Sequence, residues 1–154
     1  MVDIETLQHI SIFNDLAPDA MEKIAETAQI LIYEADEDIF YEGDASRDLY
    51  VLMEGKFAIE TNVPGRVKDN PKAFYTVKPG EIIGEFSFVD GAPRSASARA
   101  QRDSKLLKFN GKQLSELLDA DPEVGYIVMR NIARVLCSRI RNTNLTLRNA
   151  LVWL

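Results

Sequence analysis

Cysteine and histidine are almost absent from this chain of 154 residues, which contains one of each. Cys137 therefore has no partner for a disulfide within the chain, and we expect it to be a small packing residue. The sequence shows no paired cysteine and histidine spacing of a zinc site, and nothing around His9 suggests a nucleophilic triad. We expect no metal and no enzyme built on a histidine base.

Long hydrophobic runs are also missing, since none approaches the ~20 residues that span a bilayer. The first residues, Met-Val-Asp-Ile-Glu, are acidic where a signal peptide would be basic. No Walker-type glycine-rich loop and no internal repeat is present. With 46% hydrophobic and 27% charged residues, the chain has the composition of one globular domain with a substantial core. We predict a cytoplasmic protein.

Acidic residues are missing from the last segment, residues 125–154, which contains five arginines and no acid. These are Arg130, Arg134, Arg139, Arg141 and Arg148. The total charge is −6, so this segment carries +5 and the remainder carries −11. Such a body repels nucleic acid, and we expect no nucleic-acid partner. The arginines could bind an acidic surface, a phosphate or their own domain, or simply form a solvated helix face.

The most informative stretch is residues 82–97, Ile-Ile-Gly-Glu-Phe-Ser-Phe-Val-Asp-Gly-Ala-Pro-Arg-Ser-Ala-Ser. Its spacing predicts a strand, a tight turn at Gly84, one helical turn from Glu85, a loop and a second strand. Arg94 offers a planar set of donors that matches phosphate oxygens, and Ser95 adds a hydroxyl. Glu85 can only accept, which suits a sugar hydroxyl. The pattern indicates a nucleotide site, although Glu85 and Arg94 could instead form a surface ion pair of ~0–1 kcal/mol.

These residues resemble the phosphate-binding cassette of cyclic nucleotide-binding domains. That family includes the bacterial catabolite activator protein, the regulatory subunit of protein kinase A and the cyclic-nucleotide-gated channels. The matching segments are Gly84-Glu85-Phe86-Ser87 and Pro93-Arg94-Ser95-Ala96-Ser97. The resemblance extends over roughly residues 7 to 141, through the glycine patterns at 40–44, 49–55 and 78–80. Phe86 and Ser87 stand where leucine and a smaller residue are commoner, and neither change removes a donor.

The resemblance implies a cyclic nucleotide as ligand and a role for each cassette residue. Glu85 would bind the ribose 2′-hydroxyl and Arg94 the cyclic phosphate. Gly84, Phe86, Ser87, Ser95 and Ala96 would complete the contacts. In many family members a residue of the last helix caps the base, and Arg139 lies near the matching position. We favour cAMP over cGMP as the ligand.

The sequence predicts a mainly β protein with flanking helices. Short β-rich segments alternate with turns at 30–32, 39–41, 48–53, 56–61, 73–77, 81–83, 97–100 and 105–109. Glu54-Gly55 is predicted to close a hairpin between 48–53 and 56–61, and 62–71 is predicted to be a polar loop. The resemblance implies an eight-stranded β-roll of jelly-roll type with N-terminal helices. We assign 1–124 to this roll and 125–154 to a long helix and apolar tail of the same unit.

Helices are predicted at 4–15, 18–29, 110–118 and about 122–148. The last has apolar positions at steps of three and four, as a helix that pairs with another helix would have. These are Met129, Ile132, Ala133, Leu136, Ile140, Thr143 and Leu147. We predict a homodimer through this helix, although the stripe could pack only on its own domain.

We expect the domain to be a sensor in which the ligand repositions the long helix. The cassette residues Phe86, Phe88 and Val89 would repack against that helix. We expect no helix-turn-helix module after the helix, so that the chain is either a free-standing sensor or a part of a longer protein. The sequence does not identify a downstream partner. Two alternatives stay open. One is a dimeric interaction module with a non-functional pocket. The other is a cupin-like enzyme, which would need more histidines as metal ligands than this chain has.

Overall fold

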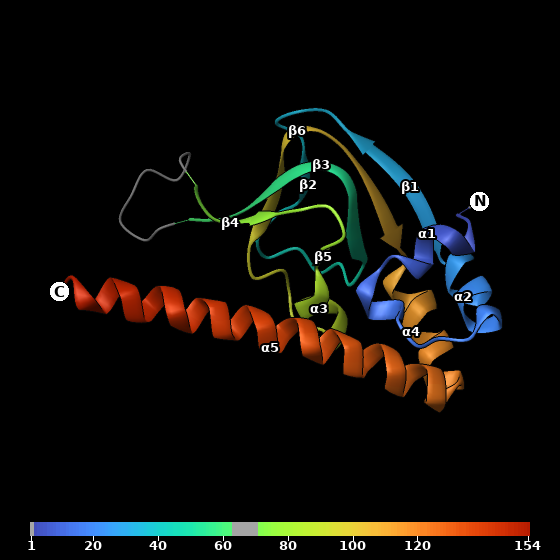
Figure 1. Ribbon diagram of the computed structural model, residues 1–154. Coiled ribbons are helices and arrows are strands. Elements are labelled where there is room, and N and C mark those ends of the chain that lie inside the picture. The colour runs from blue at the N-terminus through green and yellow to red at the C-terminus, as the bar shows by residue number, and fades with distance from the viewer. Residues whose placement is uncertain (1, 63–70) are drawn as a thin grey trace.

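The computed structural model describes residues 2–62 and 71–154. The predicted polar loop at 62–71 falls almost entirely outside the described residues. A β-roll forms the centre of the molecule, helices cover one end of it, and one long helix runs along its open side (Figure 1). Among the helices of the described residues, none combines the length and hydropathy needed to cross a membrane.

In the described residues the roll is one antiparallel sheet of six strands. They are β1 (Ala28–Tyr33), β2 (Asp38–Phe40), β3 (Leu49–Thr61), β4 (Lys72–Val77), β5 (Ile82–Ile83) and β6 (Ser97–Phe109). The strand order is β1-β6-β3-β4, with β2 paired to β6 and β5 paired to β3. The mainly β class and the flanking helices are confirmed.

The strand count differs from the predicted eight because two pairs of predicted strands are continuous. Segments 48–53 and 56–61 form β3, and 97–100 and 105–109 form β6, so the predicted hairpin at Glu54-Gly55 is wrong. Gly55 has φ of +106° and lies where the β3–β6 register shifts, so it bends the strand without reversing it. A Cβ at Gly55 would lie 2.0 Å from Ser104 Oγ on β6, which accepts a hydrogen bond from the Lys56 N–H.

Four short helical segments cover one end of the roll: α1 (Ile4–Gln8), the 3-10 helix η1 (Ser11–Phe13), α2 (Pro18–Ala25) and α4 (Gly111–Ala120). The predicted helix 4–15 is thus broken into two. The predicted helix 18–29 ends early because Ala28 begins β1 and pairs with Phe109. The capping residue at Asn110 is confirmed, since its side chain accepts from the Gln113 N–H at 3.0 Å.

The core has two parts, one at each end of the roll. The larger lies between the sheet and the helices, where Phe13 packs edge-on against Phe109 with ring centroids 5.3 Å apart. The smaller lies inside the roll around Phe57, Leu52 and Leu106. The open side of the roll is therefore left for a cavity.

The long helix α5 (Pro122–Val152) has 31 residues and begins at an Asp121 cap followed by proline, as predicted. Its buried residues all lie in its first eleven positions: Val124, Gly125, Val128, Asn131 and Ile132. Ile132 is 1% exposed and belongs to the core, so it does not share the exposed stripe predicted for it. The rest of α5 runs beneath α3 and past the end of the roll (Figure 1).

Candidate functional site

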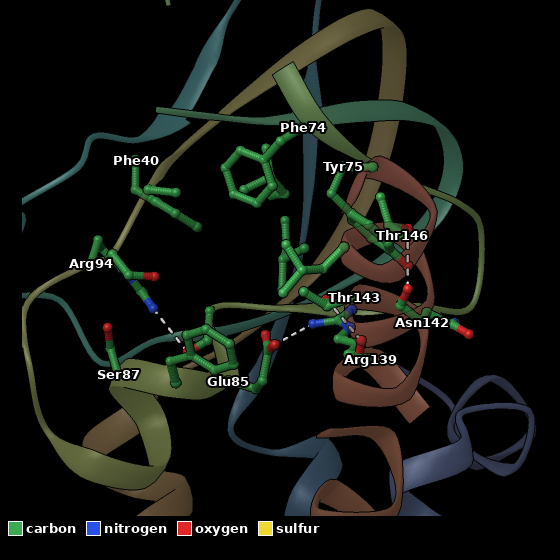
Figure 2. Close-up of a pocket in the computed structure, with 18 residues that line it drawn as sticks. Phe40, Phe74, Tyr75, Glu85, Ser87, Arg94, Arg139, Asn142, Thr143 and Thr146 are labelled. Atoms are coloured by element: carbon green, nitrogen blue, oxygen red, sulfur yellow. Dashed lines mark hydrogen bonds and ion pairs between the residues drawn. The ribbon is translucent and has the colours of Figure 1, made fainter. Parts of the chain in front are cut away.

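A cavity of about 620 Å³ lies between the roll, the cassette and the second half of α5 (Figure 2). This is the size range of small-molecule sites. All eight residues predicted from the sequence lie along it: Gly84, Glu85, Phe86, Ser87, Arg94, Ser95, Ala96 and Arg139. Within the described residues, no group of three or more His, Cys, Asp or Glu side chains is placed to hold a metal ion.

Gly84 allows the cassette to turn from β5 into the short helix α3 (Glu85–Asp90). Its φ is +83°, a region that favours glycine. A Cβ at Gly84 would lie 2.6 Å from Nη1 of Arg94 and 2.8 Å from the carbonyl oxygen of Asp48. The tight turn therefore brings the backbone against the Arg94 guanidinium, which a side chain here would displace.

Arg94 is a buried cation, with 3% of its surface exposed. Its Nη1 donates to the Gly84 carbonyl at 3.0 Å, and its Nη2 donates to the Asp48 carbonyl at 2.6 Å and to Ser46 Oγ at 3.2 Å. Its Nε is buried and has no partner among the residues that the structure describes. Burial lowers the pKa of the guanidinium, which nevertheless stays protonated at neutral pH.

The carbonyl and hydroxyl groups around Arg94 bind its guanidinium but do not neutralise its charge. In the described part of the chain no carboxylate accepts a hydrogen bond from it, because the Asp48 carboxylate binds Lys108 Nζ at 3.0 Å and the Gly111 N–H at 2.8 Å. The guanidinium carbon lies 4.4 Å from the centroid of the Phe40 ring. A buried cation with a free N–H and no paired carboxylate is suited to an anionic ligand.

Glu85 is the buried acid of the cavity, with 4% of its surface exposed. One carboxylate oxygen, Oε1, accepts from Nη1 of Arg139 on α5, and Nη2 of Arg139 donates to the Ile82 carbonyl. The guanidinium carbon of Arg139 also lies 5.4 Å from the centroid of the Tyr75 ring. Figure 2 shows Arg139 at the Glu85 side of the cavity; the base-capping role expected for it stays a prediction.

The side of the cavity across from Arg94 is formed by residues that the sequence did not predict for the site (Figure 2). From α5 come Asn142, Thr143, Thr146, Leu147 and Ala150, and from β4 come Phe74 and Tyr75. The α5 residues recur at helical spacing after Arg139, which is the signal that could have identified them. The hydroxyls of Thr143 and Thr146 donate to the carbonyls of Arg139 and Asn142, at 2.9 and 3.1 Å.

The apolar residues of the cassette divide into two groups. Phe88 is 3% exposed and already belongs to the core, whereas Phe86 and Val89 are 50% and 39% exposed. Only Phe86 and Val89 therefore remain free to repack against α5 in the way expected for all three.

A β-roll with a buried arginine and a buried acid in one cavity, closed by a C-terminal helix, defines a binding domain for a small anionic ligand. Residues 30–121 match the family model described as the cyclic nucleotide-binding domain. The chain therefore belongs to the cyclic nucleotide-binding domain family, which consists of regulatory binding domains and not of enzymes. This finding decides against the cupin-like alternative.

The relatives of the chain carry the same domain within longer proteins. It is 31% identical over 137 residues to the cyclic AMP receptor protein of Thermus thermophilus, an alignment that covers 88% of this chain and 60% of the relative. It is 31% identical over 113 residues to a cAMP-dependent protein kinase regulatory subunit of Aspergillus niger, covering 73% of this chain and 26% of that one. The chain thus spans less than two thirds of the length of each.

Solved structures show the same fold. The catabolite activator protein of Thermus thermophilus matches with a TM-score of 0.72 at 31% identity, covering 89% of this chain and 61% of that one. A putative cyclic nucleotide-binding protein of Geobacter metallireducens matches with a TM-score of 0.79 at 24% identity, covering 91% of this chain and 99% of that one.

Proposed function

We propose that this domain binds cAMP and signals its binding through α5. The observation that carries the proposal is Arg94, which is 97% buried in the cavity, keeps an unpaired Nε and lies in the same cavity as the buried acid Glu85. A cyclic phosphate supplies the missing anion, and the ribose 2′-hydroxyl supplies a donor for Glu85. Ser87 and Ser95, which line the cavity, would complete the contacts to phosphate and ribose.

The charges that line the cavity support a ligand with one negative charge. Arg94 and Arg139 are cationic and Glu85 is anionic, so these three side chains sum to +1. A cyclic phosphate diester carries −1 and would bring the sum to zero. Electrostatic balance of this kind favours the correct ligand more strongly inside a low-dielectric cavity than it would at the surface.

The adenine preference is supported by the α5 end of the cavity. Because the hydroxyl hydrogens of Thr143 and Thr146 are directed to helix carbonyls, only their oxygen lone pairs remain for a ligand. Such acceptors suit the 6-amino group of adenine and do not suit the 6-carbonyl oxygen of guanine. The name of the Thermus thermophilus relative, the cyclic AMP receptor protein, agrees with this preference.

We also propose a homodimer through α5. One face of the helix has the 3-4 repeat of a coiled coil: Tyr126, Met129, Ala133, Leu136, Ile140, Thr143, Leu147 and Ala150. Tyr126 and Ile140 are 65% and 60% exposed and do not line the cavity, so their apolar surface is free to pair. Leu147, 56% exposed, lies on the same stripe and also lines the cavity, as do Thr143 and Ala150. The stripe extends over 25 residues, or ~36 Å, which is longer than the part of α5 that packs on its own domain. The cytoplasmic location, the absence of a nucleic-acid partner and the unit boundary at 124/125 stay predictions from the sequence.

A thermal-shift screen of the ligand-free protein against cAMP, cGMP, 5′-AMP and adenosine tests the ligand. At a concentration 100 times its dissociation constant, a ligand adds ~2.7 kcal/mol to the free energy of unfolding. We expect a shift with cAMP, a smaller shift with cGMP, and little or none with the two compounds that lack the cyclic phosphate. A domain that none of the four stabilises would instead be an interaction module with a non-functional pocket.

A further inference from the structure

The distal half of α5, residues 133–152, contributes no buried residue to the protein, yet it forms one wall of the cavity. The proximal half is fixed by Asn131, whose Nδ2 donates to the carbonyls of Ile12 and Asn14 at 3.2 and 2.9 Å. Beyond Ile132, the hydrogen bonds from α5 to other described elements all come from Arg139. Val135 and Leu136 still pack against the core at the start of this half. Beyond them, and within one copy of the chain, the position of the cavity wall depends on what holds Arg139.

Among the described residues, three groups of the roll and cassette hold Arg139: the Glu85 carboxylate, the Ile82 carbonyl and the face of the Tyr75 ring. The first two belong to the cassette. Figure 2 labels Glu85, Tyr75 and Arg139. Tyr75 lies on β4, opposite Ile59 of β3, so it ties α5 to a different part of the roll. A guanidinium over a tyrosine face is attracted by ~0.5–2 kcal/mol, most strongly where water is excluded.

The Tyr75 ring is itself held at its outer end. Its hydroxyl donates to Glu81 Oε1 at 2.7 Å, and Glu81 Oε2 accepts from the Lys78 N–H at 2.8 Å in the turn that follows β4. Burial and the Glu81 carboxylate raise the pKa of the Tyr75 hydroxyl, so it remains a donor at neutral pH. A carboxylate bonded to the hydroxyl also polarises the ring toward negative charge, which favours a cation on its face.

We infer that Tyr75 and Glu81 are positioning residues that hold Arg139, and with it the distal half of α5, over the ligand cavity. We call Glu81, Tyr75 and Arg139 the clasp. Glu81 fixes the ring of Tyr75, the ring holds Arg139, and Arg139 places Thr143, Thr146 and the rest of the α5 wall. The inference deepens the proposed function, because the wall that the clasp places is the one proposed to contact the base.

Amide hydrogen exchange of the ligand-free chain, measured residue by residue by NMR, tests the clasp without any ligand. In Tyr75→Leu and in Arg139→Gln we expect exchange at residues 140–150 to quicken about tenfold, which corresponds to ~1.4 kcal/mol. Exchange at residues 124–132 should stay as in the parent. Tyr75→Phe and Glu81→Gln keep the aromatic ring, and each should quicken exchange at residues 140–150 by about threefold.

A double-mutant cycle separates a clasp from two unrelated effects. If Tyr75 acts through Arg139, the double variant Tyr75→Leu/Arg139→Gln exchanges no faster than Arg139→Gln alone. Tyr33→Phe and Glu54→Gln are the matched controls, since both positions lie away from the cavity, and they should match the parent. Additive effects in the double variant, equal acceleration along the whole helix, or unchanged exchange at residues 140–150 would each overturn the inference.

Titration with cAMP shows whether the clasp serves the pocket. We expect Tyr75→Leu to weaken cAMP binding about fivefold and Tyr33→Phe to leave it unchanged. A variant whose distal helix has loosened but whose affinity is unaltered would overturn the link between clasp and pocket. If the parent binds no cyclic nucleotide, the proposed ligand is wrong, while the exchange experiment still decides whether the clasp exists.

Discussion

Replacing Arg94 by glutamine is the sharpest perturbation that the site offers. Glutamine retains a hydrogen-bond donor and much of the side-chain volume but removes the charge. Truncating one partner of a buried, hydrogen-bonded charge pair typically costs 2–5 kcal/mol of binding energy. Arg94 is 3% exposed and makes three hydrogen bonds that aim its guanidinium, so we take a value near the middle, ~3 kcal/mol. This corresponds to a loss of about 150-fold in cAMP affinity.

The same substitution should affect the ligand-free protein much less. It leaves the carbonyls of Gly84 and Asp48 without the guanidinium donors, which costs ~1–3 kcal/mol for each group left unpaired. It also relieves the burial of a cation that no described carboxylate pairs with, an effect of opposite sign. We therefore expect the free energy of unfolding, measured from the urea midpoint, to change by much less than the ~3 kcal/mol lost from the binding energy.

Isothermal titration of cAMP into the parent, Arg94→Gln, Arg94→Lys and Arg99→Gln measures this effect. Arg94→Lys keeps the charge but loses the planar fork of donors, so we expect an intermediate loss of about tenfold. Arg99 is the matched control, because it lies five residues further on and pairs with Asp38 away from the cavity. If folded Arg94→Gln bound cAMP within threefold of the parent, the assignment of the phosphate to Arg94 would be refuted.

Three other predictions test the cassette, the dimer and the core. Gly84→Ala should destabilise the ligand-free protein by ~1–3 kcal/mol in urea unfolding, because alanine disfavours φ of +83° and its Cβ would meet Arg94 and Asp48. The control is Gly43→Ala, with φ of +91° but open space around it. It should lose only the stability that the unfavourable φ costs. Ile140→Glu on the exposed stripe should convert the dimer to a monomer in sedimentation velocity. Leu145→Glu, at a position that is 48% exposed but off the stripe, should leave the mass unchanged. A monomeric parent would contradict the proposed pairing. Burial raises the pKa of Tyr50 to about 12 from an ordinary 10, so the stability that the neutral hydroxyl contributes is complete below pH 10 and is lost as pH rises from 10 to 12. In Tyr50→Phe the urea midpoint should therefore fall less steeply over this pH range. An equally steep fall would contradict the raised pKa of Tyr50.

Features that depend on a few neighbouring residues were predictable from the sequence. The cassette is a contiguous segment, so the glycine turn, the acid and the arginine come with fixed spacing, and its seven predicted residues line one cavity. The caps at Asn110 and Asp121 were predictable for the same reason, because a cap involves side chains and N–H groups three residues apart. The apolar spacing of α5 also predicted a long helix, since its period is local.

Features that depend on partners far along the chain were decided by the tertiary structure alone. The sequence predicts a hairpin turn at Gly55, but β3 pairs with β6 on both sides of Gly55, and this pairing keeps β3 continuous. The sequence predicts Arg139 near the base, and the tertiary structure adds that its guanidinium binds Glu85, 54 residues earlier, and lies on the ring of Tyr75. No local pattern marks Tyr75, whose importance comes only from folding β4 beside α5. The sequence by itself thus determined the order and spacing of the cassette residues, because they lie within one short segment. The closure of the cavity depends on contacts that exist only once the helix and the roll have come together.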